Sequence, residues 1–229
     1  MKLTLLIPSA AWVVYFFMIV YVLARKRTNP ITIHYSIYIG NLAIWVGILF
    51  YIWSPVDDSI RILLIKLTSL FWLPAGFLFM NFIYAFLGKK RDAIFYILLS
   101  VTYITAVIGM VSELIFLNVS VEYPWGYFFK EGPYHTPVMI LIITLPVIYS
   151  VVLMLRDLPK IKHTIRYQQT WYIAVGSVIS MLIGVITDII IPKIFHYSEF
   201  IRLGFASYII QSFFIFIAID KYELLSLKV

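Results

Sequence analysis

The 229-residue chain contains no cysteine, and only 13% of its residues are charged, with 11 acidic residues against 18 Lys and Arg. The absence of cysteine excludes disulfide frameworks, thiolate metal sites and cysteine nucleophiles. A soluble domain carries about 25% charged and 45–50% apolar residues, whereas 62% of this chain is hydrophobic. That composition excludes a soluble enzyme, a disordered binding segment and a two-domain receptor.

Motifs for catalysis and metal binding are also missing. No apolar stretch pairs His with a carboxylate at the spacing of metal ligands, and there is no G-x-S-x-G, H-E-x-x-H or P-loop motif. The four histidines lie in connections or near the ends of apolar stretches, where a lone His is usually solvated. The sequence therefore predicts no enzyme activity, no metal and no cofactor.

Apolar runs, in contrast, are abundant. A membrane helix needs roughly 20 apolar residues, and seven such stretches can be marked, at residues 5–24, 33–53, 60–86, 93–112, 136–155, 170–191 and 200–219. The first reads as a retained span, because only Lys2 precedes it and no A-x-A-like cleavage site follows. The connections are short except for residues 113–135, which are rich in aromatic residues, Pro and Gly. We expect an all-α integral membrane protein, a seven-transmembrane helix bundle forming one domain over residues 1–229.

The charged residues divide between the two sides of this bundle. Basic residues follow the first, third, fifth and seventh spans: Arg25, Lys26, Arg27, Lys89, Lys90, Arg91, Arg156, Lys160, Lys162, Arg166, Lys221 and Lys228. Acidic residues dominate the opposite connections. The positive-inside rule then predicts an outside N-terminus, a cytoplasmic C-terminus and a multi-pass protein of the cell (inner) membrane. The net charge of +7 is an orientation signal, and nucleic-acid binding is not needed to explain it.

Ionisable side chains within spans are costly and therefore mark candidate functional sites. Five fall in the outer third of the predicted bundle: Arg61, Lys66, Glu113, Asp188 and Arg202. The seventh span offers Tyr208 and Gln211 on a face related to the one that carries Asp188 in the sixth span. This distribution suggests a polar cup that opens to the outside and binds a small ligand or lipid. Lys66 and Arg202 would anchor an anionic group of the ligand. Asp188 and Glu113 would set the charge of these two anchors or accept hydrogen bonds from the ligand. Alternatively, these charges snorkel to the interface or form structural pairs, with Lys66 or Arg202 as the partner of Asp188.

The sixth predicted span carries small residues at a regular spacing. Gly176, Ser180 and Gly184 recur every four residues and lead to Asp188, so the four form one stripe on a helix face. Small residues in such a stripe allow close helix packing. Pro74 and Pro146 interrupt the third and fifth spans, and each permits a bend.

Several segments resemble a known family when taken in order. They are Trp45 followed by the Trp53-Ser54-Pro55 turn, Tyr167-Gln168-Gln169 followed by Gly176, and Tyr222-Glu223-Leu224-Leu225 after the last span. From about residue 29 to 227, the sequence is similar to the N-terminal seven-transmembrane sensor region of bacterial and archaeal histidine kinases. The resemblance implies a receptor domain, a signalling helix beginning at residues 220–229, and homodimerisation. It also implies a cytoplasmic output domain, in cis after residue 229 or in trans as a partner protein.

The leading hypothesis from the sequence is therefore a signal-sensing membrane domain that binds its ligand in the outer cup and reports through the seventh helix. The alternative is a small transporter or a membrane subunit of a larger complex, for which a midplane substrate site at internal repeats is typical. No convincing repeat relates the first three spans to the last three, and the midplane lacks charge. A purely structural scaffold explains everything except the buried charges.

Overall fold

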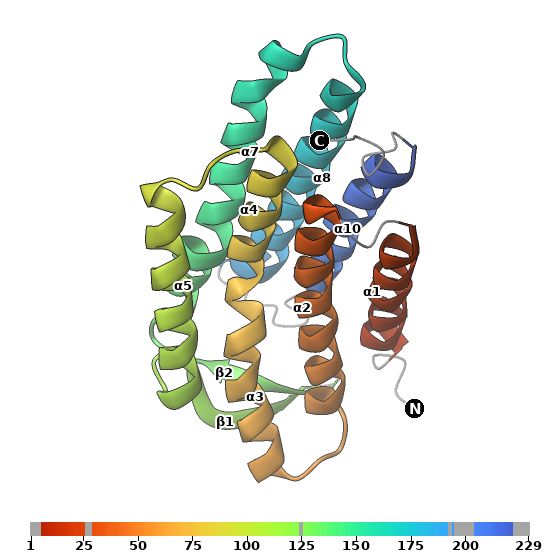
Figure 1. Ribbon diagram of the computed structural model, residues 1–229. Helices are drawn as coiled ribbons and strands as arrows, with labels where there is room; N and C mark the ends of the chain where they lie inside the picture. The colour runs from red at the N-terminus through yellow and green to blue at the C-terminus, as the bar shows by residue number, and fades with distance from the viewer. Residues whose placement is uncertain (1–5, 26–28, 124–125, 192–193, 195–203, 222–229) are drawn as a thin grey trace.

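The computed structural model describes residues 6–25, 29–123, 126–191, 194 and 204–221. Its helices lie side by side, and a two-stranded hairpin lies across one end of the bundle (Figure 1). The helices and strands are α1 (Leu6–Arg25), α2 (Pro30–Trp53), α3 (Asp58–Trp72), α4 (Pro74–Leu87), α5 (Ala93–Val111), β1 (Phe116–Tyr123), β2 (Gly126–Glu131), α6 (His135–Val138), η2 (Met139–Thr144), α7 (Leu145–Asp157), η3 (Leu158–Ile161), α8 (Ile165–Val185), η4 (Ile186–Ile190) and α10 (Gly204–Lys221).

The bundle has the helix lengths and composition of a multi-pass membrane protein. Within the described ranges, five helical rods are long and apolar enough to cross a membrane: Pro30–Trp53, Asp58–Leu87, Ala93–Val111, His135–Ile161 and Ile165–Asp188. Two shorter apolar helices, Pro8–Ala24 and Ser207–Ala218, lie within α1 and α10. Many large apolar side chains of the rods are exposed, which suits contact with lipid. The expectation of a helical membrane bundle is confirmed at this level.

The third predicted span consists of two helices that meet at Leu73. Pro74 has no N–H to donate to the carbonyl four residues back, so the helical hydrogen-bond ladder is interrupted there. Next to the break, Asn41 Nδ2 donates to the Phe71 carbonyl oxygen over 2.6 Å. The half-buried Asn41 side chain from α2 thus supplies a donor next to the interrupted ladder.

The long connection before α6 differs from the expectation of an all-α chain. It contains β1 and β2, which pair antiparallel with Ser120 opposite Phe129 and Val121 opposite Phe128. Aromatic and β-branched residues are frequent in both strands, and these residue types favour a pleated conformation. The long connection expected between the fourth and fifth spans therefore contains a β-hairpin.

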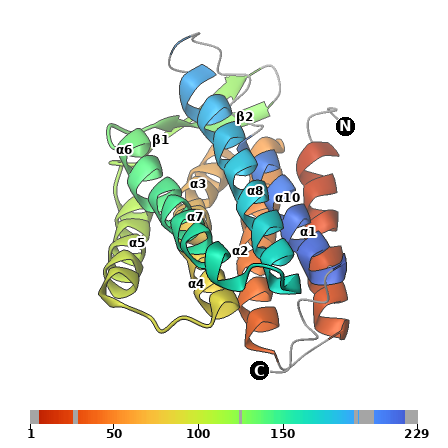
Figure 2. The same cartoon turned by 90° about the horizontal axis from the view of Figure 1, so that it is seen from above.

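The last helix lies inside the arrangement rather than at its edge. Helices α1 and α5 occupy opposite edges in both views, and α10 runs beside α8 (Figure 1 and Figure 2). The α8–α10 interface is the most extensive between any two described elements, and α10 also packs against α1 and α2. This position brings polar side chains of α10 into contact with α2 and α8.

Candidate functional site

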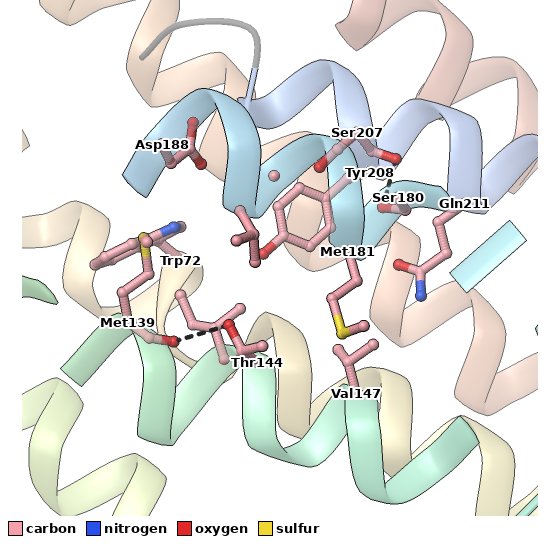
Figure 3. Close-up of a pocket in the computed structure, with 13 residues that line it drawn as sticks. Trp72, Met139, Thr144, Val147, Ser180, Met181, Asp188, Ser207, Tyr208 and Gln211 are labelled. Carbon is pink, nitrogen blue, oxygen red and sulfur yellow. Dashed lines mark hydrogen bonds between the residues drawn. The ribbon is translucent and has the colours of Figure 1, made fainter. Parts of the chain in front are cut away.

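A pocket opens between α8, η4 and α10 on one side and η2, the π-helical part of the rod His135–Ile161, on the other. Its walls come from Trp72 at the end of α3, from η2 and α7, from α8 and η4, and from α10 (Figure 3). The cavity measures about 50 Å³. Of the residues named from the sequence, Asp188, Tyr208 and Gln211 line it, as do Ser180 and Gly184 of the small-residue stripe. The pocket thus joins one end of the helical rods His135–Ile161 and Ile165–Asp188 to a face of α10.

Two π-helical segments lie on opposite walls of this pocket. Met139, Ile143 and Thr144 belong to η2, and Asp188 belongs to η4. π-Helical turns account for well under 1% of residues in proteins and occur frequently at functional sites. Because two such segments border this cavity, we take it as the candidate functional site of the described structure.

Local sequence accounts for the position of η2. Pro146, at the start of α7, lacks the N–H that would bond to the carbonyl of Ile142, so the regular α-helical ladder cannot run through this point. Gly76 of α4 lies directly beneath the Ile143 carbonyl, and a β-carbon there would come within 2.9 Å of the Ile143 carbonyl carbon. The wide π turn and the missing side chain of Gly76 allow α4 and η2 to approach closely.

Asp188 is the one acidic side chain among the described residues of the pocket wall, which include no Lys, Arg or His. It accepts a hydrogen bond of 3.1 Å from Thr187 Oγ1, and its carboxylate lies against the backbone of Gly204, the first residue of α10. No Lys, Arg or His in the described ranges forms an ion pair with it. The Glu131 carboxylate at the end of β2 adds negative potential at this position. The pocket therefore has an acidic pole at the hairpin end.

Tyr208 lies between the pocket and α2. Its ring meets the ring of Trp45 edge-on, with 5.6 Å between centroids and an interplanar angle of 87°. Its hydroxyl has no hydrogen-bond partner among the described residues, and Figure 3 shows it directed toward the η2 side of the pocket. Trp72, on that side, stacks on the His135 ring at 5.2 Å and so joins the pocket to the hairpin end.

Gln211 connects the pocket to a buried polar network deeper in the bundle. Tyr38 of α2 donates to its Oε1 over 2.6 Å, and its Nε2 donates to Ser177 Oγ of α8 over 3.1 Å. Tyr35, three residues before Tyr38 on α2, donates to the carbonyl oxygen of Ser212, the residue after Gln211, over 3.2 Å. All of these residues are buried. Helix α10 is therefore hydrogen-bonded to both α2 and α8 directly below the pocket.

The stripe of small residues on α8 faces α10. Ser180 Oγ donates to the Ser207 carbonyl oxygen over 2.7 Å. A β-carbon at Gly176 would lie 2.6 Å from Cγ of Phe214, and one at Gly184 would lie 3.5 Å from Ser207 Oγ. Close approach of the two helices at Gly176 therefore depends on glycine, whereas Gly184 borders open space in the pocket.

The other candidate binding residues do not line the pocket. Arg61 is 2% exposed and donates to the carbonyl oxygens of Ile52 and Val56, over 3.3 and 2.6 Å. It thus organises the α2–α3 connection. Lys66 is half-buried on α3 and forms no hydrogen bond or ion pair with another described residue. Glu113 is exposed and accepts a hydrogen bond from Asn118, and Arg202 lies outside the described residues. Ligand binding by these four residues stays a prediction.

Sequence reasoning missed the apolar and hydroxyl-bearing half of the site. Trp72, Met139 and Thr144 lie in spans that carry no charge at these positions, so they were counted only as parts of apolar runs. The sequence signal for this half of the site is Pro146, which lies where the rod His135–Ile161 departs from α-helix geometry. Over the part of the chain that the structure describes, no group of three or more His, Asp or Glu side chains is placed to hold a metal ion.

Searches of protein-family models, of curated proteins and of solved structures find no match to this chain. The site must therefore be interpreted from its own geometry.

Proposed function

We propose that this chain is a membrane-embedded sensing domain whose ligand occupies the pocket between η2, η4 and α10. The observation that carries the proposal is that α10 itself forms one wall of the pocket, through Ser207, Tyr208 and Gln211. A ligand in contact with these side chains interacts directly with the helix that leads to the opposite end of the bundle. It can shift the balance between two positions of α10 only through its different affinities for them.

Seven spans and an outside N-terminus belong to the same proposal. Helices α1 and α10 complete the five long rods as shorter apolar helices. The hairpin end, with the pocket and Asp188, faces outward, and the basic connections after α4 and α7 face the cytoplasm. A sensor needs this orientation, because the ligand then arrives at one end and the last helix emerges at the other. The resemblance to histidine-kinase sensor regions adds a dimer and a cytoplasmic output domain, in cis or in trans.

The orientation is tested by cysteine labelling, since the natural chain has no cysteine. Asp57→Cys lies in the exposed α2–α3 connection and Lys162→Cys in the exposed α7–α8 connection. In intact cells whose outer layer admits the reagent, a membrane-impermeant maleimide is expected to label Asp57→Cys. Lys162→Cys is expected to react only after the membrane is permeabilised. The reverse pattern would invert the proposed topology.

Signalling through α10 is tested by spin labels on Trp171→Cys of α8 and Phe213→Cys of α10, both exposed positions. Gly184→Leu fills the pocket and imitates an occupied state, because a side chain there extends past Ser207 into the cavity. We expect it to shift the distance between the labels by about 1–2 Å or more. Gly40→Leu is the matched control, since a β-carbon at Gly40 meets no atom within 4 Å. Identical distance distributions in all three proteins would refute coupling between the pocket and α10.

A further inference from the structure

The described wall of the pocket contains one acidic side chain and no basic one. Asp188 contributes a carboxylate, Glu131 adds negative potential nearby, and no described Lys or Arg is part of the wall. Of the two basic residues that the sequence suggested as anchors for an anion, Lys66 does not line the pocket and Arg202 lies outside the described residues. A carboxylate held in a partly apolar cavity attracts a cation more strongly than it would in water, since the local dielectric constant is lower.

The hydroxyl groups of the wall reinforce this polarity. Each hydroxyl has one proton to donate and two lone pairs that accept. Thr144 donates its proton to the Met139 carbonyl oxygen over 3.4 Å, Ser180 donates to the Ser207 carbonyl oxygen over 2.7 Å, and Ser207 donates to the Gly204 carbonyl oxygen over 2.5 Å. A ligand in the pocket therefore meets three hydroxyl groups as acceptors. The donors that remain, on Trp72, Tyr208 and Gln211, are neutral.

The apolar walls also suit a positive charge. Trp72 and Tyr208 present aromatic rings, whose faces attract cations within about 6 Å. Met139 and Met181 contribute flexible, polarisable thioethers that adapt to a small alkyl group. The space of about 50 Å³ limits the buried part of a ligand to a head group with a short chain.

We propose that the pocket recognises a small organic cation, specifically the primary ammonium group of an amine. The ammonium donates one N–H to Asp188 and others to hydroxyl oxygens of Ser180, Ser207 or Thr144, while its alkyl part contacts Trp72 and the methionines. This inference rests on the proposed sensing function, because it names the ligand class of the same pocket. It also reverses the charge that the sequence suggested for the ligand.

Three probes of similar size and different charge test the proposal on the full chain in lipid nanodiscs. They are ethylammonium, ethanol and acetate, each titrated at constant ionic strength while the thermal unfolding midpoint is recorded. A ligand that binds only the folded state raises this midpoint in a saturable way. Ethylammonium is expected to do so, and the other two are not. This comparison uses the natural sequence and does not depend on the folding of any variant.

Substitutions then locate the effect. Asp188→Asn is expected to raise the apparent Kd of ethylammonium about thirtyfold or more, because a buried charge-paired donor loses its partner. Glu113→Gln removes a carboxylate that is exposed and outside the pocket, and it should leave the Kd unchanged. If Asp188→Asn fails to fold, Tyr208→Phe and Gly184→Leu replace it. The first is expected to retain binding and the second, which fills the cavity, to abolish it.

The results separate this inference from the proposed function. Saturable stabilisation by acetate or ethanol that Gly184→Leu abolishes would overturn the cation preference and leave the pocket as a ligand site. No stabilisation by any of the three probes, or an ethylammonium effect unchanged in Asp188→Asn and Gly184→Leu, would overturn the cation proposal. The label distances on α8 and α10 would still decide whether the pocket is coupled to α10.

Discussion

The carboxylate of Asp188, in η4, lies directly against the backbone of Gly204, the first residue of α10. Contact between these two residues joins the acidic pole of the pocket to the N-terminal end of the last helix. A ligand that binds Asp188 would therefore act on a side chain that already contacts α10.

Gly204→Ala is expected to disturb this contact. The added methyl group would overlap the Asp188 carboxylate, so either the side chain or α10 must move. We expect a lower unfolding midpoint and weaker ethylammonium binding in nanodiscs. The control is Gly184→Ala, whose β-carbon would make an ordinary contact of 3.5 Å with Ser207. It should be neutral or stabilising by up to about 1 kcal/mol, as Gly→Ala is in helices. Equal midpoints for the two variants would show that Asp188 and Gly204 are not in contact.

The buried hydrogen bond between Tyr38 and Gln211 predicts strong coupling between the two side chains. Each single change, Tyr38→Phe or Gln211→Leu, leaves one buried polar group without this partner, at a cost of about 1–3 kcal/mol. In the double variant both groups are gone, so we expect a loss smaller than the sum of the single losses. Unfolding free energies from denaturant titrations in detergent measure this directly. Strict additivity would mean that α2 and α10 are not joined at this point.

Arg61 is expected to affect stability without affecting the pocket. Lysine keeps the charge but cannot reproduce the guanidinium fork that reaches the carbonyl oxygens of Ile52 and Val56. Arg61→Lys should lower the free energy of unfolding by about 1–3 kcal/mol and leave the Kd of ethylammonium unchanged. Asp58→Asn is the control, since the Asp58 side chain is 75% exposed and exposed pairs contribute little. A weaker affinity in Arg61→Lys would return this residue to the binding site.

Asp92 makes the stability of α5 dependent on pH. Its carboxylate caps the helix by accepting from the Phe95 backbone N–H over 2.9 Å, and this bond lowers the pKa of Asp92 below its ordinary value of 3.8. The stabilisation is therefore complete above the ordinary pKa and is lost as the pH falls through the lower, folded-state value. Asp92→Ala should cost about 1 kcal/mol at neutral pH.

Asp92→Asn separates the cap from the charge. Asparagine is as effective as aspartate at a helix N-cap, and its side chain does not titrate. The variant should therefore have the same thermal midpoint as the natural protein at pH 7. It should then become the more stable of the two at about pH 3. Thermal midpoints across this range measure the difference, and parallel curves would contradict the assignment of the cap.

Composition and residue order determined the membrane character of this protein. Five long apolar helices appear where apolar runs were marked, because a stretch of about 20 apolar residues satisfies its backbone only as a helix in lipid. The cost of placing a carboxylate in a span also identified Asp188, and the polar positions of the last span identified Tyr208 and Gln211. These inferences need only local properties of the chain.

The tertiary structure decided which of the ionisable and polar residues within the spans lie close together. Whether Lys66 or Asp188 reaches the pocket depends on the rotation of each helix about its axis, and packing against neighbouring helices sets that rotation. Trp72 and Met139 entered the site because α3 ends, and η2 widens, beside α8. The hydroxyl protons are directed to backbone carbonyls by the same local geometry. The preference for a cation that we propose therefore rests on how the helices pack, which no single stretch of sequence contains.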